Sequence, residues 1–283
     1  MKLSRKTLIL ISVAVLSLLF IIGLFRSYSL YGDTGFGLGY ILGNSVAITF
    51  TFLVIITFVI SLGFLINGIV KSIKKMEAKK LFITSAILFG ASVVSLIVLA
   101  TTVSTLANIQ EDYQKAEAQK KQEAEYLTSA ATFYTDIDSF EFFATQVLSG
   151  YSTTWSDAIN NRRDFNAAIS SKKEESKVMI SGANILYEGM GKELKVVSEA
   201  AKEQPNKYKE VYEEYKKIFE IVTALNEQVQ SPSGSLITFN QNANSLIQEY
   251  KKVAGNINIV ITDEIQIKAK EIKASYTSKN SNN

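Results

Sequence analysis

Three long uncharged runs of apolar residues constrain this chain of 283 residues more than any other feature of its sequence. Leu8–Phe25 has 18 residues, Tyr40–Val70 has 31, and Leu81–Ala107 has 27. An α-helix rises about 1.5 Å per residue and the hydrocarbon core of a bilayer is about 30 Å thick, so about 20 apolar residues can cross it. The sequence therefore predicts a membrane domain over residues 1–107. Its transmembrane helices are expected at about 8–25, 41–70 and 81–107.

The first run has an alternative interpretation as a cleaved signal peptide, because Lys2, Arg5 and Lys6 precede it like a basic n-region. The run is long for the apolar part of a signal peptide, and no small-x-small cleavage site follows it. Arg26 also stands at its exit. We expect a retained transmembrane helix.

The charges of the chain divide at the end of the third run. Residues 1–107 carry nine basic and two acidic groups, whereas residues 108–283 carry 21 basic and 25 acidic groups. The N-terminus and Lys71–Lys80 are basic, and connections of this kind stay on the cytoplasmic side of a membrane. We therefore expect a cytoplasmic N-terminus and an extracytoplasmic location for residues 108–283.

The chain contains no His and no Cys, which excludes disulfides, zinc sites built from Cys and His, cysteine nucleophiles and Ser-His-Asp triads. The net negative charge of residues 108–283 argues against a nucleic-acid partner. We expect a protein that is not an enzyme and has no catalytic, cofactor-binding or metal-binding residues. The sequence does not identify its binding residues.

Residues 108–126 are predicted to form a helical stalk. The segment has no Gly or Pro and few apolar residues. Glu111–Lys115 and Glu117–Lys121 are pairs with i,i+4 spacing, each worth about 0.2–0.5 kcal/mol to a solvated helix.

Beyond the stalk, apolar residues recur every three or four positions, and nothing alternates with the period of two that is typical of a strand. Residues 127–275 are therefore expected to form a helical bundle. Gly150 and the polar residues after it predict a turn near 150–153, with Thr154 beginning the next helix. The alternative is one helix that runs through Gly150.

Further breaks follow from local signals. The second helix of the bundle is expected to reach about Glu203, and Pro205 suits the first position of a third. Ser231-Pro-Ser-Gly-Ser predicts a turn into a last helix that reaches Ile272, and residues 276–283 are expected to be a disordered tail. The predicted fold is all-α: three transmembrane helices followed by an extracytoplasmic, elongated antiparallel four-helix bundle on a helical stalk.

Polar residues in the membrane domain have a structural interpretation. Gly35, Gly37 and Gly39 form a GxGxG pattern, but no strand precedes it, so we expect an interfacial turn and not a phosphate site. The apolar runs contain no ionisable residue. Their polar and small residues predict helix packing, and the alternatives are a pore lining or the packing of two copies. These polar and small residues are Asn44, Asn67, Thr49, Thr51, Thr57 and Ser61, and the pairs Ala86/Gly90 and Ala91/Ser95.

Candidate ligand residues in the aqueous part also have simpler interpretations. We expect Trp155 to be a core anchor. The tyrosines with helical spacing, which can form an aromatic groove but are expected in the core, are Tyr208, Tyr212, Tyr215 and Tyr250. The acidic cluster, which matches no calcium loop, is Asp136, Asp138 and Glu141. A stripe of amide side chains on the last helix can bind a glycan or another helix, but we expect it to be exposed to solvent. It consists of Asn240, Asn242, Asn244, Asn256 and Asn258.

About 90 residues resemble helical domains of uncharacterised membrane proteins and lipoproteins of Gram-positive bacteria. The residues that carry this resemblance are Trp155, Phe165-Asn166, Ile169, Tyr208, Tyr212, Tyr215, Ser231-Pro-Ser-Gly-Ser-Leu and Phe239-Asn240. The resemblance implies a helical domain exposed in the cell envelope and carries no activity.

The function predicted from these observations is that of a multi-pass cell-membrane protein that presents a helical bundle to a protein partner in the bacterial envelope. One alternative is a sensor or ligand-binding subunit that signals through a partner, because few residues are expected in the cytoplasm. Another is an accessory subunit of a membrane transport complex, which needs further subunits because the spans carry no ionisable group.

Overall fold

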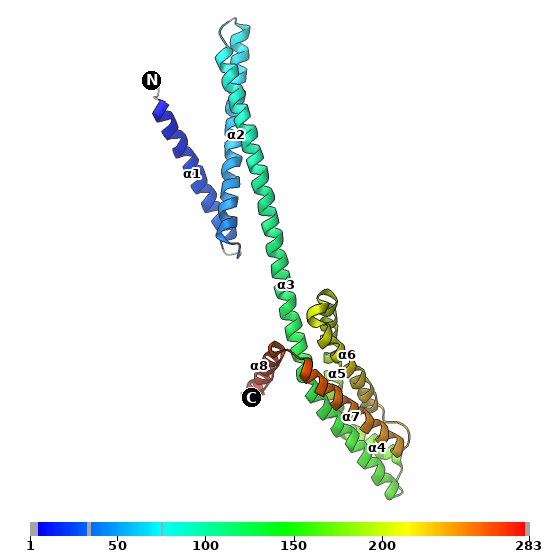
Figure 1. Cartoon of the computed structure of the whole chain (residues 1–283). Coiled ribbons are helices and arrows are strands. Elements are labelled where there is room, and N and C mark those ends of the chain that lie inside the picture. Colours follow the sequence, from blue (N-terminus) through cyan, green and yellow to red (C-terminus); the bar gives the residue numbers. More distant parts are fainter. Residues whose placement is uncertain (1–4, 33–34, 75, 281–283) are drawn as a thin grey trace. The chain divides into compact units, whose positions relative to one another are not determined.

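The computed structural model describes residues 5–32, 35–74 and 76–280, which form eight helices and no strand. In chain order the helices are α1 (Arg5–Tyr31), α2 (Leu38–Ile73), α3 (Lys79–Asn160), α4 (Phe165–Glu175), α5 (Lys177–Glu203), α6 (Pro205–Gln230), α7 (Leu236–Val260) and α8 (Asp263–Asn280) (Figure 1). The predicted all-α class is confirmed. Contacts between helices divide the chain into two units, Met1–Ala118 and Gln119–Asn283.

Three helices are long and apolar enough to cross a membrane. Among the described residues these candidate spans lie in α1 (Ala14–Tyr31), in α2 and in α3. The 36 residues of α2 correspond to about 54 Å of helix, which exceeds the roughly 30 Å of a hydrocarbon core. All three predicted apolar segments are therefore helical, while their orientation across a membrane stays a prediction.

Small and polar residues join α1 to α2 in the first unit. A Cβ atom on Gly23 would lie 2.9 Å from the main-chain oxygen of Ser45, so only glycine permits this close approach of the two helices. The Ser27 hydroxyl donates to the carbonyl of Ile41 (2.9 Å), and the amide of Asn44 donates to the Ser27 hydroxyl (3.2 Å). The helix-packing interpretation of Asn44 is confirmed.

An aromatic cluster connects the loop between α1 and α2 to α3. The ring of Phe36 stacks on Tyr40 at a centroid distance of 4.5 Å and contacts Tyr113 at 4.6 Å. Gly35 has a φ of +75°, and a Cβ atom there would lie 2.3 Å from the hydroxyl of Tyr113. Gly35 is therefore required by a turn and by a close contact, as the interpretation of GxGxG as a turn predicts.

The second unit is organised around the last part of α3. Figure 1 shows α5, α6 and α7 running alongside it, with α4 in the connection from α3 to α5. Within the buried residues, one stripe alternates steps of four and three along α3, and another alternates steps of three and four along α6. On α3 they are Tyr126, Ala130, Phe133, Ile137, Phe140, Ala144, Val147 and Tyr151, and on α6 they are Tyr208, Val211, Tyr215, Ile218, Val222, Leu225 and Val229. A mean repeat of 3.5 residues is the pattern of knobs-into-holes packing.

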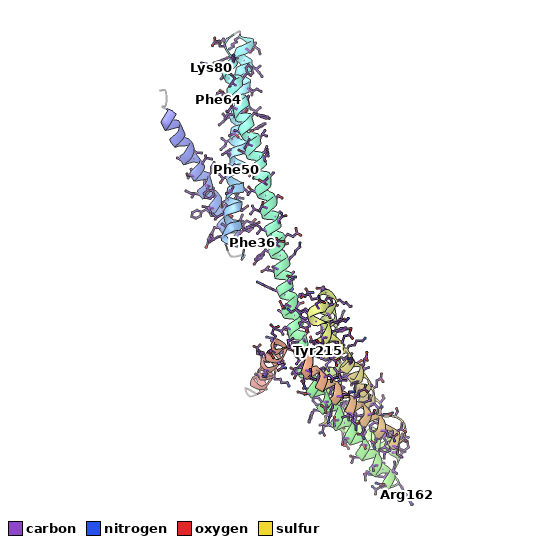
Figure 2. The ribbon with its side chains drawn as sticks, in the orientation of Figure 1. Phe36, Phe50, Phe64, Lys80, Arg162 and Tyr215 are labelled. Atoms are coloured by element: carbon purple, nitrogen blue, oxygen red, sulfur yellow. The ribbon has the colours of Figure 1, made fainter. Side chains whose placement is uncertain are left out.

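Buried tyrosines tie the neighbouring helices to α3 through main-chain oxygens. The Tyr215 hydroxyl donates to the carbonyl of Ala130 (2.8 Å), and the Tyr250 hydroxyl donates to that of Ile137 (2.6 Å). Figure 2 shows Tyr215 among the packed helices. Because a buried hydroxyl without a partner is costly, these bonds also fix how far α6 and α7 can slide along α3.

The predicted turn at 150–153 is wrong, because α3 continues through Gly150 to Asn160. One glycine costs a helix about 1 kcal/mol relative to alanine, and burial of Tyr151 and Trp155 in the core offsets that cost. The chain reverses instead after Asn160, where Arg162 has a positive φ of 54°.

Other predicted boundaries divide into correct and incorrect ones. Pro205 does begin α6, and the turn from Ser231 leads into α7. The segment predicted as a single helix from Thr154 to about Glu203 is instead the end of α3 followed by α4 and α5, with breaks after Asn160 and at Ser176. The predicted last helix is interrupted after Val260. The prediction of four helices is therefore too low for this unit, in which the end of α3 and five further helices are described.

The disordered tail predicted over 276–283 is wrong for residues 276–280, because α8 extends to Asn280. Residues 281–283 lie outside the described part of the chain. Ile265 and Ala269 of α8 are buried in the core of the second unit, and Lys273 pairs with Asp138 of α3 at 3.0 Å. From these contacts α8 continues to Asn280.

Candidate functional site

The tyrosines with helical spacing do not form a ligand groove. Tyr208, Tyr215 and Tyr250 are buried in the core, and Tyr212 is half-buried against it. Burial raises the pKa of the Tyr250 and Tyr215 hydroxyls above the ordinary value, so both stay neutral donors. The interpretation of these residues as core residues is confirmed.

The acidic cluster is resolved into two ion pairs and one carboxylate at a helix interface. Lys273 pairs with Asp138 at 3.0 Å, and Lys251 pairs with Glu141 at 3.5 Å. A Cβ atom on Gly189 of α5 would lie 3.9 Å from the Asp136 carboxylate, so Asp136 faces a position without a side chain. Within the described ranges, no three His, Cys, Asp or Glu side chains are grouped to hold a metal ion.

Burial, and secondarily the charge of Glu193, raises the pKa of Asp136 from 3.8 to about 6. A carboxyl group whose pKa is raised on folding destabilises the folded protein increasingly as pH rises above the unfolded pKa near 4, with the full effect above the folded pKa of about 6. Below the unfolded pKa it has no such effect. We therefore expect Asp136→Asn to increase the free energy of unfolding by about 1–2 kcal/mol at pH 7.5, after allowance for solvent screening, and by nothing at pH 3.5.

Urea unfolding of the full chain in detergent, followed by the fluorescence of its only tryptophan, Trp155, measures this difference. Asp138→Asn is the matched control, because Asp138 has a lysine partner, and we expect no gain from it at pH 7.5. If Asp136→Asn increased the free energy of unfolding equally at both pH values, the charge of the Asp136 carboxylate would not be the cause of the increase.

The stripe of asparagines does not act as one surface. Asn258 accepts a hydrogen bond from the Tyr134 hydroxyl at 2.7 Å. Asn240 and Asn244 line a groove of about 340 Å³ between α3 and α7, and Asn242 is exposed.

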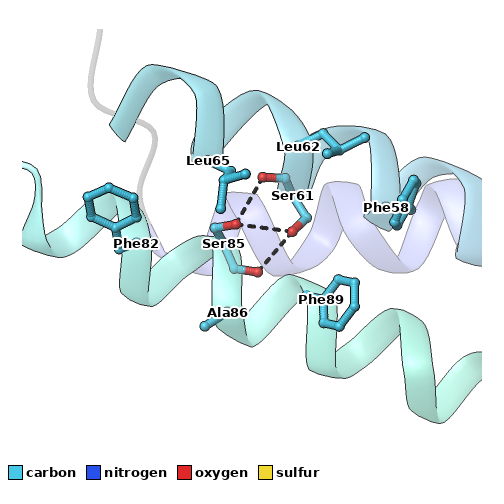
Figure 3. Close-up of a pocket in the computed structure, with 8 residues that line it drawn as sticks. All are labelled: Phe58, Ser61, Leu62, Leu65, Phe82, Ser85, Ala86 and Phe89. Carbon is cyan, nitrogen blue, oxygen red and sulfur yellow. Dashed lines mark hydrogen bonds between the residues drawn. The ribbon is translucent and has the colours of Figure 1, made fainter. Parts of the chain in front are cut away.

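In the first unit, two serines join α2 to α3 by reciprocal hydrogen bonds (Figure 3). The Ser61 hydroxyl donates to the carbonyl of Ser85 (2.9 Å), the Ser85 hydroxyl donates to that of Ser61 (3.0 Å), and the two hydroxyls are 3.2 Å apart. They lie beside an apolar pocket of about 410 Å³, which Ala86 also lines. Where water is absent such bonds hold helices together, so Ser61 and Ser85 act as packing residues.

This contact predicts an efficient disulfide in the variant Ser61→Cys/Ser85→Cys. The native chain has no Cys, so no other thiol competes, and the 3.2 Å between the hydroxyl oxygens leaves little movement for a bond of about 2 Å between sulfurs. Oxidation with copper phenanthroline in membranes, followed by alkylation with a polyethylene-glycol maleimide, should show protection from alkylation. Ser61→Cys/Thr84→Cys is the control and should remain alkylated, and equal protection in both variants would contradict the packing.

One pocket of the second unit gathers residues from three segments that are distant in the sequence. Its volume is about 280 Å³, and it lies where the end of α3, the first turns of α4 and the connection from α6 to α7 meet. We call it the Trp155 pocket, and its lining residues are Trp155, Phe165, Asn166, Ile169, Ser170, Pro232, Ser233 and Gly234. Figure 2 shows Arg162, which precedes α4, at the end of this unit.

The cap of α4 sets one wall of the Trp155 pocket. The side-chain oxygen of Asp164 accepts hydrogen bonds from the N–H groups of Asn166 (2.8 Å) and Ala167 (3.1 Å). An N-cap of this kind fixes the first turn of the helix. The side chains of Phe165 and Asn166 therefore start from a defined backbone.

The opposite wall is set by the connection from α6 to α7. Gly234 has a φ of +94°, a conformation that favours glycine, and the hydroxyl of Ser235 caps α7 by accepting from the N–H of Thr238 (3.2 Å). Lys173 of α4 donates to the carbonyl of Gln230 (2.7 Å), which ties the two walls together.

A pair of stacked rings forms the apolar part of the Trp155 pocket. Trp155 is only 6% exposed and contacts Phe239 on its inner side, as a core anchor does. Phe165 is 44% exposed and stacks on Trp155 with ring planes 6° apart and centroids 5.9 Å apart. The prediction for Trp155 is confirmed, and its burial fixes the ring of Phe165 at the surface.

The polar part of the Trp155 pocket is uncharged. Asn166, Ser170 and Ser233 supply one amide and two hydroxyls, and no lining residue is ionisable. Within the described part of the chain, these three side chains form no hydrogen bond with another residue. The pocket therefore offers neutral donors and acceptors beside an aromatic face, which suits binding and provides no group for acid–base catalysis.

The sequence pointed to several of these residues only through the resemblance described above. That resemblance includes Phe165, Asn166 and the segment from Ser231 but assigns them no role, and nothing in the sequence indicates Ser170. The available signal was local: Asp164 before an apolar residue marks a helix start, and Pro-Ser-Gly marks a turn. That the two signals meet at Trp155 follows only from the packing.

Comparisons of the chain with protein-family profiles, with curated proteins and with solved structures gave no match.

Proposed function

We propose that the chain is a membrane-anchored protein that presents an extracytoplasmic helical domain and uses it, without catalysing a reaction, to bind a partner in the bacterial envelope. The division of the chain carries this proposal. Apolar helices that can span a membrane are gathered in Met1–Ala118, whereas Gln119–Asn283 has its own buried core. An anchor joined to an aqueous domain is the simplest use of two such units.

In this proposal, residues 108–126 are a helical stalk and the following helices are an elongated antiparallel bundle. Two observations support it. Between Asn108 and Glu125 all residues except Tyr113 and Gln122 are exposed, as in a solvated helix. The connections from α5 to α6 at Gln204 and from α6 to α7 at 231–235 are short, and short connections favour antiparallel neighbours.

The proposed orientation rests on the distribution of Lys and Arg. Five lysines lie in Lys71–Lys80, which spans the end of α2 and the start of α3, whereas Arg26–Gly39 has a single basic residue. Positive connections are retained in the cytoplasm. Residues after about Asn108 are therefore assigned to the outside.

Because the chain has no Cys, single cysteines can test this topology without background labelling. Met76→Cys and Asn242→Cys both place a thiol at an exposed position. In intact cells stripped of their wall, a membrane-impermeant maleimide should label Asn242→Cys, and it should label Met76→Cys only after lysis. The opposite pattern would overturn the orientation and the extracytoplasmic role.

Partner binding is proposed at the end of the second unit that carries the Trp155 pocket, because an exposed aromatic ring there is held by a buried one.

The proposed spans can also contact a second copy of the chain. Gly90 of α3 has nothing within 4 Å of its Cβ position, so its face of the helix is open to another helix.

Site-specific photocrosslinking in intact cells tests the proposed binding surface. Benzoylphenylalanine at position 165 keeps an aromatic ring there and should give a crosslinked product that is retained in the envelope fraction. The same residue at Ile259, which is 82% exposed on α7, is the matched control and should give none. Equal crosslinking at both positions, or none at either, would contradict a binding surface at the Trp155 pocket.

A further inference from the structure

The side chains that line the Trp155 pocket have the chemistry of a saccharide site. A pyranose ring has one face made of C–H groups and an edge made of hydroxyls. The C–H face carries partial positive charge and is attracted to the negative face of an aromatic ring. Phe165 offers such a face at the mouth of the pocket, since 44% of its surface is exposed.

Polar groups line the same pocket as Phe165 and can hydrogen-bond to the hydroxyls of a sugar ring. Asn166 supplies an amide with both donor and acceptor atoms, and Ser170 and Ser233 supply hydroxyls that can do either. None of the three side chains bonds to another residue in the described part of the chain, so no intrachain bond must break for a ligand to bind.

Charge excludes the simplest competing ligands, which are anions. No ionisable side chain lines the pocket. Three cations near this end of the unit are engaged: Lys173 donates to the carbonyl of Gln230, Lys172 pairs with Glu175 at 3.1 Å, and Arg163 pairs with Asp157. Arg162 is exposed and is not one of the lining residues. A neutral ligand with many hydroxyls is therefore favoured over a phosphate or a carboxylate.

We infer that the Trp155 pocket binds a neutral saccharide ring, presented by a glycan of the envelope. This inference rests on the proposed function, because an extracytoplasmic location is what brings the domain into contact with glycans of the envelope. The volume of about 280 Å³ is at the small end of ligand pockets and accommodates one ring, with further rings of the glycan outside.

The chain offers a direct probe, because Trp155 is its only tryptophan and stacks against Phe165. The full chain in detergent is titrated with glucose, cellotriose, N-acetylglucosamine and chitotriose while the fluorescence of Trp155 is recorded. We expect a saturable change with at least one of these neutral sugars. A trisaccharide that binds more tightly than its monosaccharide identifies a polymer as the source, and equal affinity identifies a free sugar.

Two variants and two matched controls locate the site. Phe165→Ala and Asn166→Ala should each weaken binding about tenfold or more. Phe142→Ala removes another exposed phenylalanine, and Asn242→Ala another exposed asparagine, and both should bind like the native chain. Circular dichroism of each variant confirms that it is folded, and retention of sugar on equilibrium dialysis replaces fluorescence where Phe165→Ala changes the signal of Trp155.

Three results would overturn the inference. The first is the absence of binding up to 10 mM, roughly the weakest affinity (about −3 kcal/mol) that titration resolves. The second is an unchanged affinity for the sugar in Phe165→Ala and Asn166→Ala. The third is binding of a proline-rich peptide in place of the sugars. None of these results alters the labelling of Met76→Cys and Asn242→Cys, so a failure here is distinct from a failure of the proposed topology. Conversely, sugar binding by a domain that proves cytoplasmic would sustain the site and refute the proposed function.

Discussion

The second unit depends on the 3.5-residue repeat of apolar residues along the last part of α3. The stripe itself accepts hydrogen bonds from α6 at Ala130 and from α7 at Ile137. Other positions of the same stretch contact the remaining helices: Trp155 contacts α4, Phe143 contacts α5, and Asp138 pairs with α8. A helix with this repeat keeps one stripe facing its neighbours over several turns, so a single element can serve as the core of all of them. The buried hydroxyls of Tyr215 and Tyr250 then set the register that the apolar contacts leave free.

The spans, the helical class and the start of α6 could be predicted from the sequence because each depends on local composition. Apolar runs, helical periodicity and Pro205 at a first helical position carry their signal within a few turns. The turn assigned to Gly150 failed for a complementary reason. Its glycine signal is local, but the outcome depended on the burial of Tyr151 and Trp155 in a core that other helices of the unit supply.

The candidate site could be predicted only in part. Trp155 was expected to be a core anchor, and its burial agrees with that expectation. Phe165 and Ser170 belong to α4, whereas Ser233 belongs to the connection from α6 to α7, and the two segments meet beside Trp155 near the end of α3. No local signal in the sequence places these two segments together, so the site could not be predicted from them.

The three glycines of α5 imply an order of folding for the second unit. Gly182 admits the ring of Phe143, Gly189 faces Asp136, and Gly191 admits the ring of Phe219. Each glycine costs the isolated helix about 1 kcal/mol, and helices of this length are already marginal in water. We therefore expect this segment to become helical mainly as it docks against α3 and α6, so that α5 follows these two helices in the order of folding.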